Sequence, residues 1–187
     1  MAPVRRAGLG LTPAGEVSWW SVAEGRRGRR WRESVAGPGG LRHALLLETD
    51  PAGRFLHLEL ATPAGLLTLH PEPDGTLHGN HVRPRGAGIR HVVGWPFAPD
   101  DTIVVEGSPI SLAAIAWPRA ASVAEGSFVD VAGVVIGAGG ELDAVPSIRI
   151  EHLTGSRWQV GEWPPLEVDV AGLPVLDGGA TGPLERG

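Results

Sequence analysis

The sequence has 187 residues, 42% of them hydrophobic, and a formal net charge of −5 at pH 7, which fits one globular domain with a sizeable buried core. It contains no cysteine, which excludes disulfide bonds and thiolate metal ligands. No segment approaches the roughly 20 consecutive apolar residues of a membrane-spanning helix, and residues 1–13 lack the apolar stretch of a signal peptide, so we expect a soluble cytoplasmic protein with no integral membrane segment.

An arginine-rich segment comes first along the chain. All 16 basic residues are arginines, and five of them lie between Arg26 and Arg32, in the sequence RRGRRWR. Such a cluster can hold phosphate groups, but charge runs are more often solvated or flexible segments, and we favour that interpretation. The rest of the chain lacks the basic stripe that nucleic-acid binding requires, so we expect no nucleic-acid partner.

Short runs of alternating apolar and polar residues follow. The clearest is RFLHLEL (Arg54–Leu60), in which His57 and Glu59 face away from the leucines, as in a half-buried strand. Turn sequences, DPAG at 50–53 and PEPDG at 71–75, separate such runs. We therefore predict a four-stranded meander with strands at Leu41–Glu48, Arg54–Leu60, Leu66–His70 and Thr76–Val82.

The same pattern continues along the chain. GAGG at 137–140 has no following lysine and is predicted to be a hairpin turn, not a phosphate loop. SLAAIA, within 110–116, could instead form one helical turn. The further predicted strands are Gly88–Val93, Thr102–Glu106, Ile110–Ala116, Ser127–Ile136, Ser147–His152, Arg157–Val160 and Leu166–Val170.

Evenly spaced short strands predict an all-β fold, namely an antiparallel meander forming an open or half-closed β-barrel with little helix. A barrel also leaves few open strand edges. We expect residues 1–16 to form a flexible N-terminal segment, residues 17–178 a single β-barrel domain and residues 179–187 a flexible tail.

Three segments resemble the bacterial glycolipid-binding family that was once catalogued as a domain of unknown function. They are Leu45–Asn80, Gly88–Thr102 and Arg149–Gly178. The resemblance implies a half-closed antiparallel barrel whose concave face could hold an acyl chain or glycolipid. One departure is SPISL (Ser108–Leu112), which lacks the arginines of the corresponding family segment and thus any anionic headgroup contact that they would make.

Motifs of catalysis or metal binding are weak. His78 and His81, in HGNH, could be joined by His70, His91 or Glu72, but an i,i+3 pair beside a Gly-Asn turn need not converge on a metal. The adjacent aspartates at 100–101 and the acids at 48 and 59 could pair for acid–base chemistry, although turn and cap roles suit the aspartates better. No G-x-S-x-G nucleophile motif occurs. We therefore expect no metal and no cofactor.

Tryptophan–proline pairs are the remaining signal. Trp95-Pro96-Phe97, Trp117-Pro118 and Trp163-Pro164-Pro165 place large rings at strand ends, where they either seal a barrel or line an apolar cavity. Arg90 and His91 alternate along the strand that leads to Trp95, so one of the two points inward. The predicted ligand-binding residues are Arg90, His91, Trp95, Phe97 and Trp117.

These observations favour binding of an amphipathic small molecule, a lipid or a glycolipid, in an apolar barrel cavity. One alternative is a cofactor-independent enzyme, of isomerase or cyclase type, that orients an apolar intermediate in the same cavity and uses His91 or an acid as a proton shuttle. A second alternative is a structural module that binds a partner through RRGRRWR. The oligomeric state is left open by the sequence.

Overall fold

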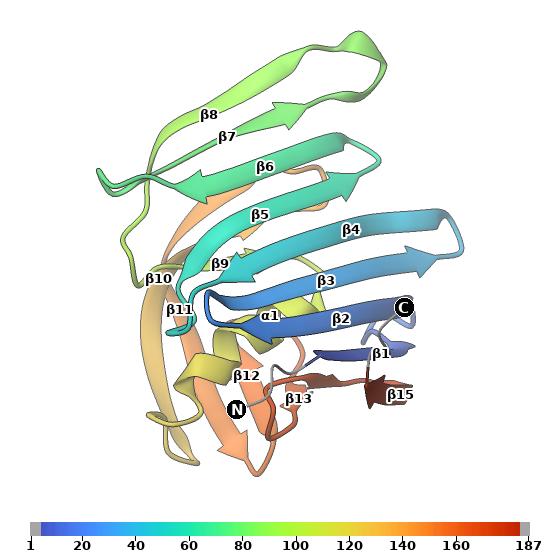
Figure 1. Ribbon diagram of the computed structural model, residues 1–187, viewed down its shortest axis with the longest axis vertical. Coiled ribbons are helices and arrows are strands. Elements are labelled where there is room, and N and C mark those ends of the chain that lie inside the picture. Colours follow the sequence, from blue (N-terminus) through green and yellow to red (C-terminus); the bar gives the residue numbers. More distant parts are fainter. Residues whose placement is uncertain (1–4, 184–187) are drawn as a thin grey trace.

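The computed structural model describes residues 5–183, which form two β-sheets with a short helix between them (Figure 1). Strands make up 61% of the described residues, and the fold is an antiparallel meander sheet of nine strands facing a curled half-barrel sheet. The predicted all-β, half-closed fold is therefore confirmed. Within the described range, no helix is long and apolar enough to cross a membrane.

The nine-stranded sheet has the strand order β15-β1-β2-β3-β4-β5-β6-β7-β8, so β4 is its central strand. All of its strand pairs are antiparallel. Its strands are β1 (Arg5–Leu11), β2 (Val17–Gly25), β3 (Gly28–Gly37), β4 (Gly40–Thr49), β5 (Phe55–Thr62), β6 (Gly65–Pro71), β7 (Thr76–Val82), β8 (Ile89–Pro96) and β15 (Asp177–Pro183).

The second sheet has the order β14-β13-β12-β11-β10-β9. β9 pairs with β10 in parallel, and the other pairs are antiparallel. The predicted GAGG hairpin is confirmed, because 137–140 joins the antiparallel strands β10 and β11. Its strands are β9 (Thr102–Val105), β10 (Ser127–Ile136), β11 (Leu142–Thr154), β12 (Arg157–Val160), β13 (Leu166–Val168) and β14 (Pro174–Val175).

Each predicted strand overlaps a strand of the structure except the one predicted over Ile110–Ala116. That prediction was wrong. This segment belongs to helix α1 (Pro109–Ala116), which is followed directly by the 3-10 turn η2 (Trp117–Arg119). Another 3-10 turn, η1 (Pro84–Gly86), lies between β7 and β8. Ser108 caps α1, since its Oγ accepts a hydrogen bond from the Ser111 amide at 3.1 Å. All eight helical residues are buried, so α1 has no polar face and shows no helical periodicity.

The core lies between the two sheets and surrounds α1, which contacts β9, β3 and β12–β14. In Figure 1, α1 lies behind the nine-stranded sheet. Alternation along β3 shows how one strand serves both faces: Arg29, Trp31 and Glu33 point into the core, whereas Arg30 and Arg32 are exposed on the outer face. The arginine-rich segment is therefore the β2–β3 hairpin, and its charges are divided between the two faces of the sheet.

The two ends of the described chain meet at one edge of the nine-stranded sheet, where β1 pairs with β15. β1 falls within the N-terminal segment that the sequence predicts to be flexible, and β15 overlaps the predicted flexible tail from residue 179. Residues 1–4 and 184–187 of those two predicted segments lie outside the described residues.

Candidate functional site

A groove opens at one end of the two-sheet core, beside the N-terminus of α1. Its volume is about 610 Å³, which lies within the usual range for small-molecule sites of about 300–1,000 Å³. We call it the end groove. Segments far apart in the sequence line it: residues 11–16 around the β1–β2 turn, Arg42, residues 107–112 at the start of α1, Arg157, residues 163–167 and residues 175–177.

The walls of the end groove are largely apolar and its rim is charged. The apolar side chains come from both sheets and from α1: Leu11, Pro13, Ala14, Pro109, Leu112, Trp163, Pro164, Pro165, Leu166, Val175 and Leu176. On the rim, Arg42 forms an ion pair with Glu16 at 3.0 Å, and Glu167 accepts a hydrogen bond from Ser156 at 2.8 Å.

Two rim groups of opposite charge have no such partner. Within residues 5–183, no hydrogen bond or ion pair engages the side chains of Arg157 and Asp177. Polar groups that are free at the edge of an apolar groove can anchor the polar end of a ligand, because their hydrogen-bonding capacity is not used inside the protein.

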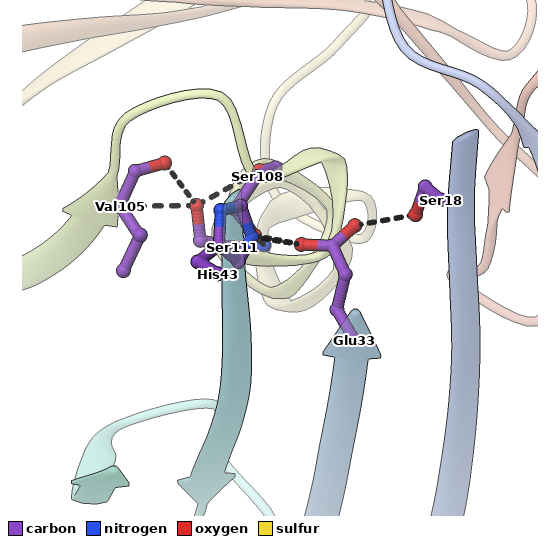
Figure 2. A network of polar contacts seen from close by, with 6 residues as sticks. All are labelled: Ser18, Glu33, His43, Val105, Ser108 and Ser111. Atoms are coloured by element: carbon purple, nitrogen blue, oxygen red, sulfur yellow. Dashed lines mark hydrogen bonds and ion pairs between the residues drawn. The ribbon is translucent and has the colours of Figure 1, made fainter. Parts of the chain in front are cut away.

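A buried polar network, drawn in Figure 2, adjoins the groove at Ser108, which is part of the groove lining. Its centre is the Glu33 carboxylate on β3, whose side chain is fully buried. Ser18 Oγ donates to Glu33 Oε1 at 2.8 Å and Ser108 Oγ donates to Glu33 Oε2 at 2.5 Å. His43 Nε2 lies 3.3 Å from Glu33 Oε2. The network therefore joins three adjacent strands, β2, β3 and β4, to the start of α1.

The same network continues into the helix. Ser111 Oγ donates toward the carbonyl oxygens of Val105 and Ser108, and it accepts from the Val105 amide at 3.2 Å. Ser108 belongs both to this network and to the groove lining. The Ser108 hydroxyl proton is directed at Glu33 and not at His43, so the set lacks the nucleophile–base contact of a hydrolase. Its role is to fix the floor of the groove.

The residues predicted to bind a ligand do not converge in the structure. Arg90 and His91 are exposed on the edge strand β8, where Arg90 Nη2 donates to the Gly140 carbonyl at 3.4 Å and His91 Nδ1 lies 2.8 Å from Asn80 Oδ1. Arg90 is on the core side of β8, because it pairs with the inward-facing His81.

The aromatic members of the predicted set lie apart from one another. Phe97 is buried against Phe55, with ring centroids 5.6 Å apart. Trp95 is half-buried, and its indole Nε1 is buried with no hydrogen-bond partner among the described residues. Trp117 packs edge-on against Trp31 at 6.3 Å. None of these side chains lines the end groove, whereas Trp163, from another Trp-Pro pair of the sequence, does.

Trp117 also supports a buried arginine. The Arg29 guanidinium lies 3.5 Å from the centroid of the Trp117 ring, donates to the Ala171 carbonyl at 2.7 Å and pairs with Glu24 at 2.9 Å. Burial lowers the pKa of Arg29 from its ordinary value, although the nearby charge of Glu24 opposes this shift. Arg29 therefore joins the β2–β3 hairpin to the segment that follows β13.

A second hollow, of about 630 Å³, is bounded by Trp117, Trp158 and His152. His152 stacks on Trp158 with centroids 4.3 Å apart, and both of its ring nitrogens lie near carbonyl oxygens, those of Val123 at 3.1 Å and Gly155 at 2.8 Å. Its polar groups are thus engaged within the protein, and this hollow is a weaker candidate than the end groove.

The histidines of HGNH do not form a metal site. The Gly-Asn pair lies inside β7 and not in a turn, so His78 and His81 project to opposite faces of the strand. Burial, together with the charges of Arg90 and Arg83, lowers the pKa of His81. Within residues 5–183, no three histidine, aspartate or glutamate side chains are grouped as metal ligands require.

Comparison with known proteins identifies a fold relative. No family model matches the sequence, and no curated protein is significantly similar to it. Among solved structures, the protein resembles the crystal structure of a DUF1089 family protein (PA1994) from Pseudomonas aeruginosa, with a TM-score of 0.56 and 16% sequence identity over 84% of this chain and 86% of that chain. The chain therefore has a DUF1089-like fold.

Proposed function

We propose that this protein binds an amphipathic small molecule, a lipid or a glycolipid, with its apolar part in the end groove and its polar part at the rim. The observation that carries the proposal is the combination of an apolar groove of about 610 Å³ with the oppositely charged side chains of Arg157 and Asp177, which have no side-chain partner among residues 5–183. A rim of mixed charge suits a neutral or zwitterionic polar group better than a strongly anionic one.

Burial of an alkyl chain supplies the affinity in this proposal. Each buried methylene contributes about 0.8 kcal/mol, so some ten methylenes contribute about 8 kcal/mol against an association cost of about 4–15 kcal/mol. Binding of useful strength therefore needs a preformed site. The network around Glu33 supports one, because it fixes the start of α1 against three strands.

One further line supports the proposal without adding residues to the site. The sequence resembles the bacterial glycolipid-binding family in the segments given above. The set around Trp95 is a rival location for the same function. Substitutions in the two places can separate them.

The first experiment is native mass spectrometry of freshly purified protein, compared with a denatured and solvent-extracted sample. We expect an adduct of lipid mass that extraction removes. Titration with n-dodecyl-β-D-maltoside below its micelle concentration, followed by tryptophan fluorescence, is expected to saturate, whereas maltose without the alkyl chain should give no change. Binding of maltose alone would contradict the role of the apolar groove.

A matched pair of substitutions locates the site. Val175→Glu places a charge in the groove wall, and Val93→Glu places the same charge on β8, far along the other sheet. Both valines are exposed, at 44% and 69% respectively, so neither change buries a charge in the core. We expect Val175→Glu to weaken dodecyl maltoside binding at least tenfold and Val93→Glu to leave it unchanged. The reverse result would place the ligand at the β8 end.

The two alternative functions, an enzyme and a partner-binding module, stay predictions. The extracted samples described above also test the first of them. An enzyme that rearranges its ligand would return an extracted molecule that differs from the one added. A partner module acting through RRGRRWR would use the exposed arginines, which are Arg26 and Arg27 in the turn and Arg30 and Arg32 on β3, and not the buried Arg29.

A further inference from the structure

The outer face of the nine-stranded sheet, which is turned away from α1, carries a row of apolar side chains. Strand pairing aligns one residue from each strand: Leu9, Trp19, Ser34, Ala44, Ala61, Leu66 and Val82, from β1 to β7. The four large members are 40–49% exposed. Large apolar side chains aligned across an open sheet face are typical of an interaction surface.

This row is symmetric about the central strand β4. Small residues occupy β3, β4 and β5, and large ones occupy β1, β2, β6 and β7 on the two sides. The small residues leave a hollow of about 480 Å³, with Trp19 on one side and Leu66 on the other.

In the next row along the strands, two charged residues of opposite sign are placed symmetrically about β4. Pairing aligns Arg32 on β3 with Leu46 on β4 and Glu59 on β5, and both charged side chains are exposed. One positive and one negative group therefore stand at equal distances on either side of β4, in the same row.

We propose that this face binds a second copy of the chain, with the two-fold axis running along β4. Such an axis exchanges β3 with β5 and β2 with β6 (Figure 1). Arg32 then faces Glu59 of the second copy, and Trp19 faces the second copy's Leu66. The hollow between them accommodates the two indole rings, one from each copy. A symmetric dimer needs such a self-complementary surface, in which residue i meets residue j and j meets i.

The size and charge of the face suit this partner. From Leu9 to Val82 the row spans roughly 29 Å at the usual strand spacing, and a strip three residues deep covers roughly 600 Å² per copy, near the lower bound for specific interfaces. Arg32 and Glu59 cancel in charge, so the face has little attraction for an anionic membrane or a nucleic acid.

Charge reversal tests the proposed pairing. By analytical ultracentrifugation we expect the protein to sediment as a dimer, at twice the 19.5 kDa of the chain. Arg32→Glu makes both charges of the face negative and Glu59→Arg makes both positive, so each variant alone is expected to be monomeric. Mixed in equal amounts, the two variants should form a heterodimer, since opposite charges then meet at both positions.

The mixture distinguishes loss of pairing from loss of folding, because misfolded variants would not recover a dimer. Arg26→Glu is the matched control: it reverses an exposed arginine in the β2–β3 turn, away from this face, and is expected to remain dimeric. Trp19→Ala should weaken dimerisation at least tenfold. A monomeric wild-type protein at about 100 μM, well above the micromolar Kd of a weak complex, would overturn the proposal, as would two reversed variants that stay monomeric when mixed.

Discussion

Replacement of Glu33 by alanine tests whether the buried network stabilises the groove floor. The Glu33 side chain is fully buried and its carboxylate accepts hydrogen bonds from Ser18 and Ser108, with His43 Nε2 at 3.3 Å. The substitution removes the acceptor from all three groups and leaves them buried. It also leaves a cavity where the side chain was.

The expected loss of stability follows from these contacts. Each buried donor left without an acceptor costs about 1–3 kcal/mol, not additively, and three donors lose their acceptor here. We therefore expect Glu33→Ala to lower the free energy of unfolding by about 4 kcal/mol. Ser18→Ala removes one hydrogen bond to a charged group, and its expected cost is about 1.5–3 kcal/mol.

Urea denaturation followed by circular dichroism measures these values, provided that the denaturant dependence stays the same among variants. Glu33→Gln keeps the shape of the side chain and retains an acceptor and donors, so it should cost clearly less than Glu33→Ala. The network is not a stabilising unit if Glu33→Ala costs less than about 1 kcal/mol, or if Ser18→Ala and Ser108→Ala are strictly additive in the double variant.

Three further substitutions test other parts of the structure. His81 has a lowered folded-state pKa against an ordinary value of 6.5, so the unfolded chain takes up the proton first and stability falls as pH drops below about 6.5. The urea midpoint of His81→Gln should therefore fall less between pH 7 and about pH 5.5 than that of the wild type; equal falls would rule this out. Arg29→Ala should destabilise by about 3 kcal/mol through lost hydrogen bonds and the contact with Trp117, whereas Arg26→Ala should be near neutral in the same urea assay. Gly172 has φ +80°, and an added Cβ would lie 2.1 Å from the Trp117 ring, so Gly172→Ala should lower the free energy of unfolding by about 3 kcal/mol. The control is Gly155→Ala, where the space is open, and it should lower the free energy of unfolding by only about 1–2 kcal/mol. Equal losses of stability in the two variants, measured by calorimetry, would refute the steric clash with Trp117.

The strands could be predicted because alternation is a local property of the sequence. In β5, Leu58 and Leu60 are buried and His57 and Glu59 face outward, as the run RFLHLEL indicates. The same rule explains β3, where alternation places Arg29 inside although a cluster of five arginines suggests a solvated segment. The high arginine content of this segment obscured the alternation of buried and exposed residues along β3, which the apolar residues Trp31 and Val35 indicate.

Helix α1 could not be predicted from hydrophobic periodicity, since a helix that is buried all round has no polar face. Its start does carry a local signal: Ser108 at the N-cap and Pro109 at the first helical position are both typical of helix N-termini. β15, in contrast, has the sequence DGGATGP, with no alternation and with Thr181 as its one β-branched residue. Its strand conformation depends on pairing with β1, from the far end of the chain.

The candidate site lay beyond sequence analysis for a related reason. Its lining comes from six separate stretches of chain, and only the closure of the two sheets around α1 brings them together. Of the Trp-Pro pairs, the predicted site included Trp95 and Trp117, yet Trp95 is on an edge strand and Trp117 packs against Arg29. Trp163 lines the groove because its short segment connects β12 and β13 at the open end of the half-barrel.

The two proposed surfaces use opposite sides of the same strands. On β3 and β4, the inward residues Glu33 and His43 support the groove floor, and the outward residues Arg32 and Ala44 belong to the dimer face. Because side chains of a strand alternate between faces, a substitution on the outer face need not disturb the network inside. Ligand binding by Arg32→Glu in its monomeric form should therefore equal that of the wild type, whereas a loss of dodecyl maltoside binding on dissociation would mean that the groove is complete only in the dimer.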